Sequence, residues 1–400
     1  MKKCFFGAIA VLALASCSNE KVVELSQDQE IKFTATAGKA LSRANDGYCN
    51  KSLPANIYLS AAYTTDGSTY VQYFKNDAFK LNSGKEYISS GSVRYWPELT
   101  NANQKLKFFA TTATTPGDPN PIDIAAPAWV TGNTGMTLKD YTVGTTVANQ
   151  HDLLYAVTEV TSKPTDGLQE INFRHALSQI EFRAKNENTN IRVEICGVKV
   201  VNVNNKGTFT FSESTDLNIP QHDYTGADAA NKGVWSALAD KKTYGVTFGP
   251  VEVKAAGTEL TTENDASKEY SANTMYLIPQ AIVPWNKDDH AKPTDENTNT
   301  YFLVTAKIWN IAGDSWTAND VILWGSGESM KATGAKDIAI PAAAVTWAPG
   351  KRYVYTFVFT TDGNGGTDPG TGDEVLTPIR LDVTVDDFVN HTEETVDMVK

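Results

Sequence analysis

The sequence predicts an all-β protein, and three observations carry that prediction. Short segments with alternating apolar and polar residues recur along the chain, as in residues 31–37, IKFTATA. Clusters of Gly, Pro, Asn, Asp and Ser separate these segments, as turns between strands require. No window has the apolar spacing of a convincing amphipathic helix. Many short strands with regular turn signals are typical of β-sandwiches.

Several further segments have the composition of strands. They are residues 106–110, 180–182, 191–195, 198–203, 275–279 and 301–309. The run 198–203 ends in Asn204-Asn205-Lys206-Gly207, which predicts a turn at that point. The segment 353–359 places four aromatic side chains on one strand face, so we expect that face to lie in a core.

Composition limits the class of protein. The chain has 400 residues, of which 41% are hydrophobic and 10% aromatic, which is enough for substantial cores and for two or more domains. No repeat of 20–50 residues is evident, which disfavours propellers and solenoids. The formal net charge of −12 argues against a nucleic-acid partner, because binding to phosphates needs a basic surface.

The first residues indicate export as a lipoprotein. Lys2 and Lys3 precede the apolar run 4–14, which is short for a membrane helix but suits a signal peptide. The run ends in Leu14-Ala15-Ser16-Cys17, where small residues before Cys17 fit cleavage by a lipoprotein signal peptidase and acylation of the thiol. An ordinary signal peptide followed by a chance cysteine is the alternative. Of the remaining cysteines, Cys49 and Cys196 could form one disulfide or be two buried thiols.

Motifs for catalysis are missing from the sequence. Five histidines are present, but HExxH, CxxC, GxSxG and phosphate-binding glycine motifs are not, so we expect no enzyme activity, no metal and no cofactor. The loop 362–374 matches a calcium loop only in its first positions.

The tryptophans raise the possibility of carbohydrate binding. Trp96, Trp309 and Trp347 have apolar neighbours and are expected in the core. Trp235, Trp285 and Trp316 lie among polar residues and could be exposed, but a glycan platform needs coplanar exposed rings that a sequence does not reveal.

Six segments, taken in order, resemble one protein family. They are Tyr95-Trp96-Pro97, residues 152–156 (DLLYA), residues 173–182 (FRHALSQIEF), residues 277–280 (LIPQ), Ile340-Pro341, and residues 347–355 (WAPGKRYVY). Together with the lipoprotein signal they resemble the fimbrillins, the type V pilins of Bacteroidales-type bacteria. The resemblance implies two transthyretin-like β-sandwich domains in tandem, lipoprotein export, proteolytic maturation and polymerisation by strand exchange.

Both ends of the chain are compatible with that mechanism. The strand at 31–37 is followed by the polar segment LSRANDG, and the resemblance implies a cut between Arg43 and Ala44 that frees the strand and the lipid. Near the other end, residues 379–386 alternate strictly, with Ile379, Leu381, Val383 and Val385 on one face. This segment could be donated to a neighbouring subunit, or it could be an ordinary edge strand of its own chain.

The predicted domain limits follow from these assignments and from two polar breaks, at 161–167 and at 362–372. They are a signal peptide at 1–16, a lipidated propeptide with the removable strand at 17–45, an N-terminal β-sandwich at 46–165, a C-terminal β-sandwich at 166–361, and a flexible linker with the candidate donor strand at 362–400. The strand that begins at Ile171 could belong to either sandwich.

The leading hypothesis is a structural pilus subunit. Its expected partners are other copies of a pilin, an Arg-specific protease and, before maturation, the outer membrane through the lipid anchor. A host or bacterial surface receptor is a further candidate partner. The alternative is a monomeric surface lipoprotein that acts as a tip adhesin or glycan-binding module, which would need no donor strand.

Overall fold

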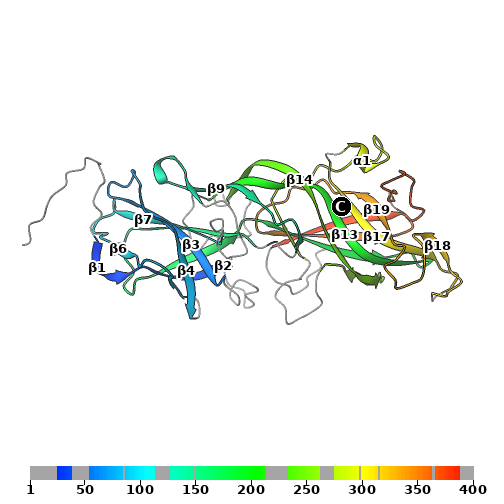
Figure 1. Cartoon of the computed structure of the whole chain (residues 1–400), viewed down its shortest axis with the longest axis horizontal. Helices are drawn as coiled ribbons and strands as arrows, with labels where there is room; N and C mark the ends of the chain where they lie inside the picture. Colours follow the sequence, from blue (N-terminus) through cyan, green and yellow to red (C-terminus); the bar gives the residue numbers. More distant parts are fainter. Residues whose placement is uncertain are drawn as a thin grey trace, which may run out of the picture.

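The computed structural model describes residues 25–37, 54–83, 86–112, 127–147, 150, 152–212, 233–261, 274–296, 299–313, 316–362 and 365–387. Within these ranges the chain is built of β-strands, with a 3-10 turn at Thr131–Asn133 and a single-turn helix, α1 (Pro293–Glu296). The all-β class predicted from the sequence is confirmed. No helix in the described ranges is long and apolar enough to cross a membrane. The molecule is elongated, with early strands at one end and late strands at the other (Figure 1).

Early strands form a closed barrel. Its hydrogen-bonded order is β10-β11-β2-β5-β4-β3-β7, and β7 pairs again with β10. These strands are β2 (Lys32–Ala37), β3 (Asn56–Thr64), β4 (Val71–Ser83), β5 (Glu86–Ser89), β7 (Lys105–Thr111), β10 (Leu154–Val160) and β11 (Leu168–His175). Their alternation places one row of apolar side chains of each strand inside, and aromatic rings such as Phe79 and Phe108 fill the interior.

A two-stranded sheet lies at the end of the barrel, formed by β1 (Leu25–Glu30) and β6 (Tyr95–Pro97). Because β1 leads directly into β2, this small sheet holds the chain just before it enters the barrel. In Figure 1, β1 and β6 mark the outer end of the N-terminal half.

The other half consists of two sheets. The first contains β12 (Ser178–Asn186), β15 (Thr258–Glu259), β16 (Met275–Leu277), β20 (Lys351–Phe359) and β21 (Ile379–Asp387). The second contains β8 (Ala128–Trp129), β9 (Met136–Thr142), β13 (Ile191–Thr210), β14 (Val234–Glu252), β17 (Tyr301–Asn310), β18 (Val321–Trp324) and β19 (Lys336–Pro341). Side chains of both sheets share one core, as the ring contact between Phe182 of β12 and Phe302 of β17 shows.

The strand β13 continues through the turn that the sequence predicts at residues 204–207, so that prediction is wrong. Its first half pairs with β17 and its end pairs with β9, while β14 runs along its other edge. The irregularity is absorbed as bulges, with Asn202 at φ 64°. At Gly207 the strands pack closely: a Cβ there would lie 2.9 Å from Leu238 Cδ2 and 3.3 Å from Ser236 O of β14, so the Leu238 side chain would have to shift.

The two halves are joined by interleaved strands and shared side chains. The strand β11 belongs to the barrel, whereas β9, which lies earlier in the sequence, pairs with β13 of the second half. Phe109 and Tyr155 of the barrel strands pack against Phe211, which follows β13, and so extend the second core. The domain limits near residue 165 stay a prediction, and the sheets on either side of it are connected through this packing.

Candidate functional site

The first candidate site is the position that β2 occupies in the barrel, which we call the β2 slot. One wall is β11, which pairs in parallel with β2 from Lys32–Leu168 to Ala37–Phe173. The other wall is β5, which pairs antiparallel through Phe33–Tyr87 and Thr34–Glu86. Because β2 is bonded along both edges, its removal would open the barrel and leave two rows of backbone groups without partners.

The interior of the slot is apolar and tightly packed. Ile31, Phe33 and Ala35 are fully buried, and their spacing of two residues places them on the inner face. The ring of Phe33 contacts two other rings edge-on, at 5.0 Å from the centroid of Phe108 and 5.3 Å from that of Phe79. Burial of a large apolar side chain stabilises by roughly 1.5–3 kcal/mol, so this row contributes several kcal/mol to holding β2 in place.

The mouth of the slot lies beside β6. The Ile31 N–H donates to Arg94 O at 2.8 Å, and the Lys32 N–H donates to Gly167 O at 3.2 Å. The indole Nε1 of Trp96 also donates to Gly167 O, at 3.2 Å. Gly167 has φ +74°, and a Cβ there would lie 2.8 Å from Glu30 O, so a larger residue would block the start of β2. These residues therefore fix where the strand enters.

The second candidate site is β21, which carries the predicted donor residues. It pairs with β20 in an unbroken antiparallel register over nine residue pairs, from Ile379–Phe359 to Asp387–Lys351. Exposure rises along the strand: Ile379 is buried, Leu381 and Val383 are partly buried, and Val385 is 50% exposed. Within the described residues β21 is the last strand of its sheet, so it is bonded along one edge.

A continuous stretch of chain connects the two sites. The strand β11 passes through the buried residues Ala176 and Leu177 into β12, which pairs in parallel with β20. At this bend His175 is fully buried, and its Nδ1 lies 2.5 Å from Asp152 Oδ2. The segment 173–182, which carries the most characteristic part of the family resemblance, is thus the segment that crosses from the barrel to the sheet of β21.

Several predicted residues lie outside the described part of the chain, namely Cys17, Arg43, Ala44 and Cys49. The other cysteine, Cys196, is a buried free thiol. Sequence analysis did not single out Arg94 and Gly167 at the mouth of the slot. The Tyr95-Trp96-Pro97 motif and the Gly in a turn were the available signals for them.

The tryptophans divide unevenly between core and surface. Trp96, Trp309 and Trp347 are buried, as predicted. Trp285 is also buried, because its indole donates to His290 O at 2.9 Å and packs against Tyr301, so the suggestion that it could be exposed is wrong. Trp235 is partly buried, and its Nε1 donates to Ala176 O at 2.6 Å.

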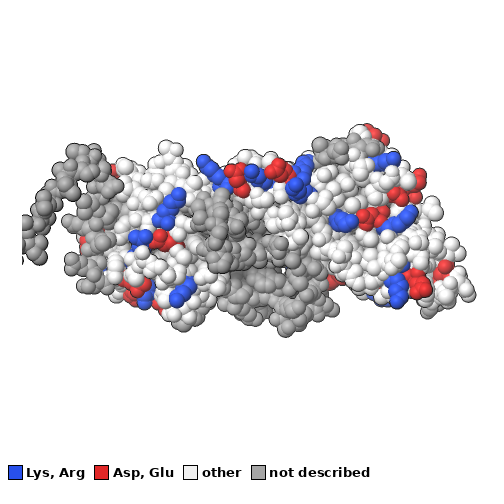
Figure 2. Space-filling view, in the orientation of Figure 1, with Lys and Arg blue, Asp and Glu red and all other residues white. Residues whose placement is uncertain are grey.

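The described residues hold no group of three or more His, Cys, Asp or Glu side chains that could bind a metal ion. On the face shown in Figure 2, positive and negative side chains are interspersed over the surface. The two candidate sites are thus the strand β2, which is enclosed between β11 and β5, and the edge strand β21, which is bonded to β20 alone among the described strands.

Comparison with known proteins assigns a class to this fold. A family model described as fimbrillin-like matches residues 42–377. A fimbrial protein from Bacteroides vulgatus is similar at 13% identity and a TM-score of 0.49, over 90% of this chain and all of that one. Candidate cell adhesion proteins from Parabacteroides distasonis and Bacteroides uniformis are 12% and 13% identical, with TM-scores of 0.45 and 0.41, over 91% of this chain and 98% and 99% of theirs. None of the curated proteins searched matches.

The family match covers most of the chain and defines a class of fimbrial subunits of the cell surface. The chain belongs to the fimbrillin-like family. It is accordingly a fimbrial subunit of the cell surface and not an enzyme.

Proposed function

We propose that the protein is exported as a lipoprotein acylated at Cys17, is cut between Arg43 and Ala44, and then polymerises by strand exchange. In this scheme β2 leaves the slot after cleavage, and β21 of another copy takes its place. Cleavage after Arg43 would separate the subunit from its lipid as well, since Cys17 lies upstream.

The unequal seating of the two strands supports the proposal. A strand in the β2 slot is bonded along two edges and buries its whole inner row at Ile31, Phe33 and Ala35. At its own position β21 is bonded along one edge and leaves Val385 half exposed. Moving β21 into an empty slot would replace its nine pairs with β20 by six pairs with β11 and two with β5, and would complete the burial of its apolar row.

The exchange also has costs. Release of β21 breaks its nine residue pairs with β20. It also uncovers part of β20, including Phe357 and Phe359, which pair with Leu381 and Ile379. Association itself costs an estimated 4–15 kcal/mol. The pairs gained in the slot do not outnumber those lost, so the exchange depends on the burial of the apolar row, and we expect a fibre to persist through slow dissociation as much as through equilibrium.

One substitution separates folding from assembly. Val383 is partly buried on β21, and if Ile379 takes the place of Ile31 in the slot, Val383 takes the place of the fully buried Ala35. We expect Val383→Asp to give a folded monomer that does not polymerise, because a charge cannot be buried there without a partner. Thr384→Asp, on the exposed face, is the matched control and should polymerise. Electron microscopy after cleavage is the measurement, and normal fibres of Val383→Asp would rule out β21 as the donor.

The cleavage site has its own test. Arg43→Ala should leave a full-length, lipid-bearing precursor that forms no fibres, whereas Lys39→Ala should be processed normally. Mass spectrometry of the surface protein reports the new N-terminus. Processing of Arg43→Ala at the same position would overturn the assignment.

A further inference from the structure

Large apolar side chains are exposed mainly at the two ends of the molecule. Among the described residues, those with this property are Val93, Tyr95, Val234, Val283, Trp316, Val321, Met330, Leu376 and Val385. We define the N-terminal pole as β6 with residues 91–94, and the C-terminal pole as β18 with residues 186–190, 316–320 and 325–335. Val93 and Tyr95 belong to the first pole, and Trp316, Val321 and Met330 to the second. Single exposed apolar residues are normal on a protein surface, so the case for a contact surface depends on where these residues lie.

The pairing of strands shows that the C-terminal pole is also where β21 begins. Val321 lies opposite Asn310, and the next residue, Ile311, donates its N–H to Asn190 O. Three residues earlier in that loop, Glu187 donates its N–H to Phe359 O, and Phe359 pairs with Ile379. Leu376 precedes Ile379 by three residues and is 81% exposed. In Figure 1, β18 lies at the end of the molecule opposite β1 and β6.

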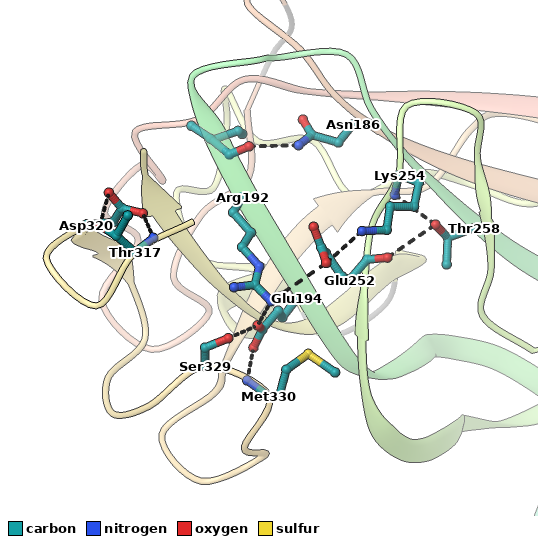
Figure 3. Close-up of polar contacts among 11 residues, drawn as sticks. Asn186, Arg192, Glu194, Glu252, Lys254, Thr258, Thr317, Asp320, Ser329 and Met330 are labelled. Carbon is teal, nitrogen blue, oxygen red and sulfur yellow. Dashed lines mark hydrogen bonds and ion pairs between the residues drawn. The ribbon is translucent and has the colours of Figure 1, made fainter. Parts of the chain in front are cut away.

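The loops of the C-terminal pole are held by buried polar groups. Glu194 is 2% exposed and accepts hydrogen bonds from Ser329 Oγ at 2.6 Å and from the Met330 N–H at 2.7 Å, and Arg192 lies 2.9 Å from it (Figure 3). Lys307, 1% exposed, donates to Glu328 O at 2.7 Å. A surface ordered in this way loses little conformational entropy on binding.

The same network holds the exposed side chains outward. Met330 is kept at φ 54° with 49% of its surface exposed, and the Arg192 guanidinium lies 4.9 Å from the ring centroid of Trp316. A left-handed backbone is unfavourable for Met, so holding Met330 in this exposed position lowers the stability of the fold.

The direction of β2 then determines how two copies meet. The mouth of the slot, at Arg94 and Gly167, lies at the N-terminal pole, while its inner end leads to the buried bend at Ala176. A donated strand that runs as β2 does, in parallel with β11, has its first residue at the mouth. Because β21 is attached through Ile379, its first residue would lie at the acceptor's N-terminal pole, which leaves no spacer between the two bodies.

We propose that the C-terminal pole of one copy docks on the N-terminal pole of the next, with Trp316, Val321 and Met330 facing Val93 and Tyr95. This contact rests on the proposed strand exchange and adds a second, apolar interface to it. The two patches differ, so the contact is head-to-tail and propagates into a filament. The partner that this surface fits is a second copy of the same chain.

The test uses full-length protein cut by an Arg-specific protease. Val321→Asp with Met330→Asp should raise the protein concentration needed for polymerisation about tenfold, as loss of interface contacts worth about 1.4 kcal/mol would. A synthetic peptide of residues 376–390 should still bind the cut variant, because its slot is unchanged. The matched control is Val234→Asp with Val283→Asp, because both valines are 56% exposed, between Met330 at 49% and Val321 at 63%. Both lie away from the poles: Val234 pairs with Thr210 at the end of β13, and Val283 O accepts from the Thr300 N–H, beside the end of β17 that does not pair with β18. Polymerisation of the pole variant at the same protein concentration as the control would overturn the docking contact.

Disulfide crosslinking tests the contact between the poles directly, because a folding defect would not produce a specific crosslink. In a Cys49→Ser background, fibres mixed from Val321→Cys and Tyr95→Cys subunits should form an intermolecular disulfide, and fibres mixed from Val283→Cys and Tyr95→Cys should not. Fibres without the first crosslink would contradict the contact while leaving strand exchange intact. If the unmodified cut protein neither binds the peptide nor polymerises, the proposed function fails and the docking contact fails with it.

Discussion

The strands β2 and β21 have similar sequences of alternating apolar residues but are held very differently. In β2 the apolar row at Ile31, Phe33 and Ala35 is fully buried between two bonded neighbours. In β21 burial decreases from Ile379 to Val385, and one edge is bonded. Alternation therefore identifies a strand that must bury one face, but the neighbours it finds decide how firmly it is held.

The largest expected effect is in the barrel. Phe33→Ala should lower the free energy of unfolding of the uncut protein by about 3–5 kcal/mol, because it empties a site enclosed by the Phe79 and Phe108 rings. Urea denaturation measures this change. Thr34→Ala, on the outer face of the same strand, should cost less than about 1 kcal/mol. Equal losses for the two variants would contradict the enclosed slot.

The next effect tests the gradient along β21. Ile379→Ala should cost about 2–3 kcal/mol, since Ile379 is 2% exposed, while Val385→Ala should cost less than about 0.5 kcal/mol. Urea denaturation of both variants beside the parent chain reports the difference. Similar losses at both positions would mean that β21 is held evenly along its length.

The pH dependence of stability tests a buried carboxyl group in the sheet of β21. Burial raises the pKa of Glu181 on β12 above its usual 4.5, and the Thr274 hydroxyl donates to its carboxylate at 3.2 Å. A carboxyl group with a raised pKa keeps its proton longer in the folded chain, so stability falls as pH rises from about 4.5 through the folded pKa. Glu181→Gln, which retains an acceptor for Thr274, should flatten this fall. An unchanged pH profile of the unfolding free energy would exclude Glu181 as its source.

The smallest effect concerns the surface charges of β21. Arg380 lies 3.1 Å from Asp382 and 3.6 Å from Glu187, and all three side chains are at least one-third exposed. Solvent screens such pairs, so Arg380→Ala should change the unfolding free energy by less than about 0.5 kcal/mol. A loss above 1 kcal/mol in urea denaturation would show that β21 is held by charge as well as by its apolar row.

Sequence reasoning recovered what local pattern encodes. The alternation at 31–37 and 379–386 predicted both strands, and the four aromatic residues from Tyr353 to Phe359 are buried on one face of β20, as expected. These features depend on a period of two residues, which any half-buried strand must show.

Features that depend on distant parts of the chain were not predictable. The sequence at 204–207 has turn-forming residues, yet β9 and β14 pair across it and β13 continues. The segment 362–372 is flexible by composition, yet its described part is tied down, because Thr367 pairs with Ala339 and with Glu374. In both places tertiary partners supplied hydrogen bonds that local composition does not specify.

The continuous chain from β11 to β12 has a mechanical consequence. On the barrel side it lies alongside β2, and on the other side alongside β20, in parallel register both times. A load that pulls the molecule along its length would act parallel to these strands and shear their ladders, so many hydrogen bonds would have to break together instead of one after another. The bend at Ala176 and Leu177 would then carry tension between the two halves.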